Sequence, residues 1–235
     1  MREYDLIQNS DVSLPLLISA VDHWDGWTHT SVPLLVDPDI MDHTCPYGVT
    51  DKRLTHSSGK QHVASAEQSF LQLEKELRIW DDNFMALTPC YRDESVLDDT
   101  HLNIFMKLEL LWYNPYGDLK EGLDEVVEQA CDFWKGNGVP VRTVQTDEGI
   151  DILFGDGSFE IHPEWGSTEL GSFGIRKSPK GVTYIYGTAL AEPRASQAVK
   201  RSLSIVACSG CGSRLGEPNY DERLFMCGGS PRCCP

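Results

Sequence analysis

Two charged residues, Arg92 and Glu94, follow the apolar run 84–91 and come directly before an acidic loop. A second apolar run, 103–112, carries Phe105 near its start. A planar guanidinium binds two oxygen atoms at once and stabilises charge that builds up on phosphorus, so an arginine in this position suits chemistry at a phosphate group. The alternative interpretation of Arg92 and Glu94 is a solvated, charged turn.

This arrangement resembles motif 2 of the class II aminoacyl-tRNA synthetases, in which an arginine and a glutamate precede a loop and a returning strand with an aromatic residue. The resemblance implies that Arg92 clamps the α-phosphate of ATP and the amino acid carboxylate. It further implies that Glu94 holds the adenine amino group and that Phe105 stacks on the adenine ring. Many members carry a glutamate before the stacking phenylalanine, whereas this chain has Ile104.

A second segment, 169–176, reads Glu-Leu-Gly-Ser-Phe-Gly-Ile-Arg. It resembles the aspartate branch of the family, which comprises aspartyl- and asparaginyl-tRNA synthetases and the ammonia-dependent asparagine synthetase. The resemblance implies that Glu169, helped by Ser172, holds Mg²⁺ on the triphosphate, and that Arg176 grips a substrate side-chain carboxylate. Arg176 would fit aspartate, a glutamate-like substrate or another acidic ligand. The alternative is a glycine-rich hairpin with incidental charges.

Two further segments occur in the order that the family requires. Residues 187–194 end in Arg194 ahead of a helical stretch and resemble motif 3, which implies that Arg194 contacts the γ-phosphate. Upstream, Glu67 and Gln68 resemble the segment that recognises the α-ammonium group of the amino acid, although capping of a helix explains Glu67 equally well.

The proline-bearing run 34–39 stands where the family has motif 1, which builds a dimer interface, so the resemblance implies a homodimer. Its residues are apolar and interrupted by prolines, which favours an edge strand or an interface segment over a central strand or a helix.

Five cysteines crowd into the last 28 positions. Two-residue spacing and glycines allow two thiolates to face one ion, so this tail is expected to bind structural Zn²⁺. The expected ligands are Cys208, Cys211, Cys227 and Cys233, with Cys234 as the alternative fourth ligand. The competing interpretation is a free or disulfide-linked tail.

The helices and strands that must position these residues are expected to form an α+β fold. Helices are expected at 65–77 and 119–135, where apolar residues recur at three and four positions. The two apolar runs, 84–91 and 103–112, are expected to be strands joined by the acidic loop. Further short strands are expected at 141–145, 150–154, 159–161 and 182–186. Hairpin-linked strands after a long helix indicate an antiparallel sheet flanked by helices, the synthetase-type architecture. We expect a catalytic core over 1–205 and the cysteine-rich tail over 206–235.

Composition sets further bounds. The 235 residues, of which 40% are hydrophobic and 24% charged, are typical of one globular domain. A formal net charge of −16 argues against nonspecific nucleic-acid binding, although a local basic site could exist. The chain lacks a signal-peptide pattern and an apolar run long enough to span a membrane, so a cytoplasmic location is expected.

Three hypotheses follow. The first is an ATP-dependent ligase that adenylates aspartate and transfers it to ammonia or another small acceptor. The second keeps adenylation but loads the amino acid onto a tRNA, a protein or a modified nucleic acid; a tRNA acceptor is possible but not favoured, because 235 residues leave no room for an anticodon-binding domain. The third is a noncatalytic paralogue, since fold alone does not establish function.

Overall fold

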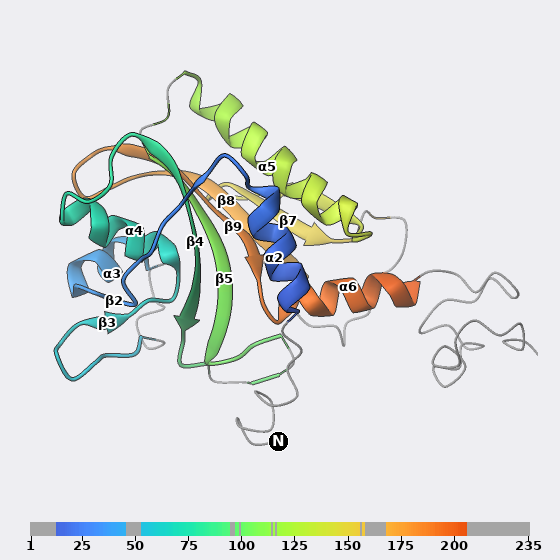
Figure 1. Ribbon diagram of the computed structural model, residues 1–235, viewed down its shortest axis with the longest axis horizontal. Coiled ribbons are helices and arrows are strands. Elements are labelled where there is room, and N and C mark those ends of the chain that lie inside the picture. The colour runs from blue at the N-terminus through green and yellow to red at the C-terminus, as the bar shows by residue number, and fades with distance from the viewer. Residues whose placement is uncertain are drawn as a thin grey trace, which may run out of the picture.

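A seven-stranded sheet forms the centre of the protein, as the computed structural model shows for residues 13–45, 53–94, 97, 98, 100–113, 115, 117–155, 157 and 168–205 (Figure 1). In spatial order its strands are β1 (Thr28–His29), β4 (Asp82–Tyr91), β5 (Ile104–Tyr113), β9 (Thr183–Ala191), β8 (Glu169–Lys177), β7 (Ile150–Phe154) and β6 (Val141–Gln145). All neighbours pair antiparallel except β1 and β4, which are parallel. The predicted antiparallel sheet is thus confirmed, apart from this edge pair.

Helices cover both faces of the sheet (Figure 1). One face carries α2 (Leu14–His23), α5 (Leu119–Gly136) and α6 (Arg194–Ile205). The other carries α3 (Pro38–Thr44) and α4 (Ala66–Lys75), beside the small sheet of β2 (Leu35–Val36) and β3 (Gln61–His62). Side chains along a strand alternate between faces, so Leu110 of β5 packs in the α5 core and Leu111 in the α4 core.

The two predicted helices form for the expected local reasons. Ser65 caps α4, and the side chain of Gln68 returns to the backbone N–H of Ser65 to complete a capping box. Asp118 caps helix α5, because its carboxylate accepts hydrogen bonds from two backbone N–H groups of the first turn. Its apolar residues face the sheet at intervals of three and four.

The run 34–39 differs from its prediction. It does contribute a two-residue strand, β2, at the edge of the small sheet, but helix α3 begins directly afterwards at Pro38. A proline at the first helical position loses no hydrogen bond, because that N–H has no intrahelical partner, and its fixed φ suits a helix. The proline therefore starts a helix here. Helix α2 was not predicted from the sequence.

Some predictions fall on residues outside the described ranges. These are the strand at 159–161 and the cysteine-rich tail of 206–235 with its expected zinc ligands. Within the described residues, no helix has the length and apolar character needed to cross a bilayer.

Candidate active site

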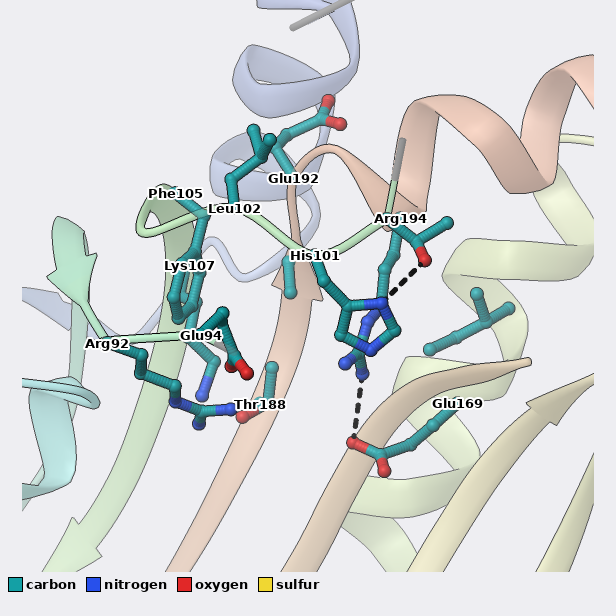
Figure 2. Close-up of a pocket in the computed structure, with 13 residues that line it drawn as sticks. Arg92, Glu94, His101, Leu102, Phe105, Lys107, Glu169, Thr188, Glu192 and Arg194 are labelled. Carbon is teal, nitrogen blue, oxygen red and sulfur yellow. Dashed lines mark hydrogen bonds and ion pairs between the residues drawn. The ribbon is translucent and has the colours of Figure 1, made fainter. Parts of the chain in front are cut away.

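The first pocket lies where the β4–β5 hairpin meets the start of α6 (Figure 2). The backbone N–H of Arg92 donates to the carbonyl of Asn103 at 3.0 Å, which extends the hairpin beyond the strands. The backbone N–H of Glu94 donates to the Asn103 side-chain oxygen at 2.9 Å. Phe105 lies on the returning strand, and the Arg92 guanidinium carbon is 5.3 Å from its ring centroid. The three residues of the motif 2 pattern thus line one pocket.

The opposite side of this pocket carries Glu169 and Arg194 (Figure 2). Glu169 begins β8 and Arg194 begins α6, and their charged groups are 3.5 Å apart. His101 also lines the pocket, and its Nδ1 lies 3.0 Å from the Asp98 carboxylate. No regular spacing relates His101 to the other residues of the pocket, so its place there was not predicted from the sequence.

A second, larger pocket of about 370 Å³ opens beside the first. Four residues line both pockets: Arg92, Lys107, Glu169 and Thr188. Two cations therefore stand where the two pockets meet, which is where a phosphate of one ligand and a carboxylate of another could share them. Ser172 and Arg176 of β8 line the second pocket, as do Glu67 and Gln68 at the start of α4.

Glu67 and Arg176 form an ion pair in the second pocket. Arg176 Nη1 is 2.9 Å from Glu67 Oε2, and the Tyr184 hydroxyl donates to Glu67 Oε1 at 2.8 Å. Burial raises the pKa of the Glu67 carboxyl above its ordinary value, although Arg176 and Tyr184 oppose this shift. Burial also raises the pKa of the neighbouring Tyr186 to about 12, so this hydroxyl keeps its proton.

The two residues at the start of α4 have different roles. Gln68 closes the capping box, since its side-chain oxygen accepts from the backbone N–H groups of Ala64 at 2.8 Å and Ser65 at 3.2 Å. The capping role considered for Glu67 is therefore performed by Gln68. Glu67 instead points toward Arg176 and remains a ligand-binding candidate.

Lys107 and Glu109 of β5 form a buried ion pair that was not predicted from the sequence. Lys107 Nζ donates to Glu109 Oε1 at 2.6 Å, and both side chains are largely buried. Burial opposes ionisation of Glu109, but Lys107 and the hydrogen bonds from Ser65 and Ala66 outweigh it and hold the pKa of this carboxyl below its ordinary value. The two positions are separated by one residue in a strand, so both side chains lie on the same face of the sheet. Two charges at such positions in an apolar strand were the signal in the sequence.

The donors near Glu169 suit Mg²⁺. This ion prefers oxygen ligands and is usually held through one or two carboxylates together with substrate phosphates. Glu169 offers a half-exposed carboxylate and Ser172 a hydroxyl on the same strand, and both line the second pocket. Among the described residues, no group of three or more His, Cys, Asp or Glu side chains is placed to hold a metal ion by itself.

No protein-family model and no curated protein sequence matches the chain. Solved structures do. The pyrrolysyl-tRNA synthetase of Desulfitobacterium hafniense superposes with a TM-score of 0.61 at 17% identity, over 83% of this chain and 74% of that one. A second structure of the enzyme from this organism gives 0.56 at 17% identity, over 86% and 76%.

The seryl-tRNA synthetase of Pyrococcus horikoshii, complexed with ATP, gives a TM-score of 0.65 at 18% identity, over 84% of this chain and 51% of that one. The chain has the fold of a class II-type synthetase core. At these identities the likeness establishes the fold alone. The three structures are pyrrolysyl and seryl enzymes, so the aspartate branch stays a prediction.

Proposed function

We propose that this synthetase-like protein activates an amino acid with ATP by forming an aminoacyl-adenylate, and that aspartate is its substrate. The observation that carries the proposal is the pair of contiguous pockets with Arg92 and Lys107 at their junction. Adenylation joins a carboxylate to the α-phosphorus of ATP, so it needs two ligand sites that meet at cationic groups.

ATP would occupy the first pocket. The adenine ring would stack on Phe105, Glu94 would accept a hydrogen bond from its amino group, and Arg194 would bind the γ-phosphate. A similar solved structure is a synthetase complexed with ATP, which supports a nucleotide in this fold. Mg²⁺, held through Glu169 with Ser172, would neutralise charge on the phosphates.

The amino acid would occupy the second pocket with its α-carboxylate toward Arg92. A carboxylate oxygen attacks the α-phosphorus in line and forms a new P–O bond. The bond between the α-phosphorus and the oxygen that bridges the α- and β-phosphates breaks. Pyrophosphate leaves with the bonding electron pair. Arg92 and Lys107 bind the oxygens on which charge accumulates, so the chain acts by positioning and electrostatic stabilisation. Glu67 would bind the α-ammonium group, and Arg176 the side-chain carboxylate.

The acceptor in this proposal is ammonia or another small nucleophile. A tRNA acceptor is the second candidate, because the similar solved structures are tRNA synthetases. The net charge of −16 weakens that candidate, since binding of nucleic acid depends largely on neutralising phosphates. Zinc in the C-terminal tail and assembly as a homodimer remain predictions from the sequence.

Exchange of labelled pyrophosphate into ATP tests the proposal. The protein would be assayed with each of the twenty amino acids in the presence of Mg²⁺, with Arg92→Ala as the negative control. Exchange that depends on aspartate and is lost in the variant is the expected result. Exchange with a different amino acid would retain adenylation and overturn the choice of aspartate. If no amino acid supports exchange, with or without added tRNA and ammonia, the proposed activity is wrong.

A further inference from the structure

Arg176 forms ion pairs with two carboxylates, those of Glu67 and Glu148. Its Nη1 lies 2.9 Å from Glu67 Oε2, and its Nη2 lies 2.9 Å from Glu148 Oε2. The face of its guanidinium covers the Tyr186 ring, with 4.3 Å between the guanidinium carbon and the ring centroid. Both terminal nitrogens are therefore engaged at the position where an acidic substrate would have to bind.

The two partners differ in exposure. The Glu67 side chain is 9% exposed, so its displacement from Arg176 would leave a buried carboxylate with the Tyr184 hydrogen bond but without a counter-charge. The Glu148 side chain is 62% exposed. Ion pairs between solvent-exposed groups contribute little free energy and exchange readily for other partners. Arg176 thus pairs with one buried and one exposed carboxylate, and the exposed one is the easier to displace.

The backbone beneath Glu148 is fixed although its side chain is exposed. In the β6–β7 turn, the N–H of Thr146 donates to the carbonyl of Gly149 at 2.8 Å, and the N–H of Gly149 donates to the Thr146 hydroxyl at 3.1 Å. Gly149 has φ +156°, and a Cβ there would lie 1.9 Å from the carbonyl oxygen of Phe173 on β8. The turn is held against β8, so rotation of the Glu148 side chain alone can release Arg176 Nη2.

We propose that Glu148 is an internal placeholder for the side-chain carboxylate of a dicarboxylic amino acid. The substrate carboxylate replaces the Glu148 carboxylate on Arg176 Nη2, while Glu67 keeps Nη1. This assignment rests on the proposed function and deepens it, because it specifies which contact the substrate must displace. The guanidinium carries five N–H donors, so it can hold two carboxylates at once, as it does with Glu67 and Glu148.

The Glu148 carboxylate lowers the affinity for an acidic ligand in two ways. It competes for Nη2, and its negative charge repels the incoming carboxylate. A neutral amide such as that of asparagine experiences little of this repulsion and is a poor competitor for a charged partner. Removing the Glu148 charge should therefore strengthen aspartate binding more than asparagine binding.

Calorimetric titration of L-aspartate and L-asparagine, without ATP, tests the proposal on the full-length protein. The variants are Glu148→Gln and a matched control, Asp147→Asn, which removes the same charge from the adjacent exposed position of the turn. We expect Glu148→Gln to lower the Kd of aspartate by about two- to fivefold, the range that corresponds to an exposed ion pair. Asparagine binding and the Asp147→Asn variant should show no comparable change.

Three results would overturn the assignment: an aspartate Kd that is unchanged or higher in Glu148→Gln, an equal gain in Asp147→Asn, or no aspartate binding to any of the proteins. Pyrophosphate exchange on the same preparations separates this assignment from the proposed activity. The expected binding pattern without exchange would retain Glu148 as the placeholder and contradict adenylation. Exchange with another amino acid, without aspartate binding, would retain adenylation and contradict the role of Glu148.

Discussion

The Ser65 hydroxyl donates a hydrogen bond to the Glu109 carboxylate at 2.8 Å, across 44 positions of sequence. The backbone N–H of Ala66 also donates to this carboxylate, as does the Thr188 hydroxyl of β9 at 3.0 Å. One buried side chain of β5 thereby joins the start of α4 to the neighbouring strand. Glu67 is the next residue of α4, so the position of its carboxylate in the second pocket depends on this connection.

Replacement of Glu109 should therefore destabilise the protein. Glu109→Gln keeps the shape of the side chain but leaves the buried Lys107 ammonium without a counter-charge. We expect a loss of about 3 kcal/mol in the free energy of unfolding at pH 7, the scale observed when one partner of a buried pair is removed. Urea denaturation measures this loss. Glu125→Gln on the exposed face of α5 is the control and should change little.

The same pair predicts a pH dependence. The pKa of Glu109 is lower in the folded protein than its ordinary value of 4.5. Its stabilisation is therefore fully present above that value and is lost as the pH falls through the lower, folded-state pKa. The difference between wild type and Glu109→Gln should be largest near neutral pH and shrink in acid. A difference that stays constant down to pH 3 would contradict the lowered pKa.

Arg92 should control the chemical step. Arg92→Ala is expected to lower kcat/KM for adenylate formation by about 10²- to 10³-fold, the effect of removing one preorganised donor from a developing charge. Arg92→Lys should recover little of this activity, because an ammonium cannot bind two oxygens in the fork geometry of a guanidinium. Arg78→Ala provides the control, since Arg78 is exposed and pairs with Glu76 outside both pockets. Full activity in Arg92→Ala would remove this residue from the mechanism.

Phe105 should act on ATP binding and leave amino acid binding unchanged. Stacking of a base on an aromatic ring contributes about 1–3 kcal/mol, so Phe105→Ala should raise the KM for ATP by about 5- to 150-fold. Phe105→Tyr, which keeps the ring, should remain close to wild type. The measurement is steady-state exchange with each substrate varied in turn. An equal rise in both KM values would indicate a general disturbance of the hairpin.

Local signals in the sequence were sufficient for much of the fold. The capping box at Ser65 and Gln68 and the periodic apolar face of α5 involve residues a few positions apart, so they can be read directly from the chain. The order of strands in the sheet cannot be read in this way. It brings Glu67 to Arg176 across 109 positions, and no periodicity encodes that meeting.

The site shows the same division. Arg92, Glu94 and Phe105 belong to one hairpin, and the strand–loop–strand pattern placed them together correctly. Glu148 was missed, because its turn meets Arg176 only through the pairing of β7 with β8. Lys107 and Glu109 were passed over as members of an apolar strand, although two charges at alternate positions of such a strand indicate a polar site on one face.

Gly171 offers a test of the packing that supports both pockets. A Cβ at this position would lie 2.5 Å from the carbonyl oxygen of Thr188 on β9 and 3.0 Å from the Phe173 ring. Because the first neighbour is backbone within the sheet, it cannot rotate away, and Gly171→Ala should destabilise the protein by about 2–3 kcal/mol. The control is Gly136→Ala at the end of α5, where a Cβ meets nothing within 4 Å. Alanine there should be neutral or stabilise by about 0.4–1 kcal/mol, because it restricts the unfolded chain.

Thermal and urea denaturation of the Gly171→Ala and Gly136→Ala variants would measure the contrast. Equal stability of the two would show that β8 and β9 are not packed as closely as the structure places them, and the shared lining of the two pockets by Glu169 and Thr188 would then lose its support.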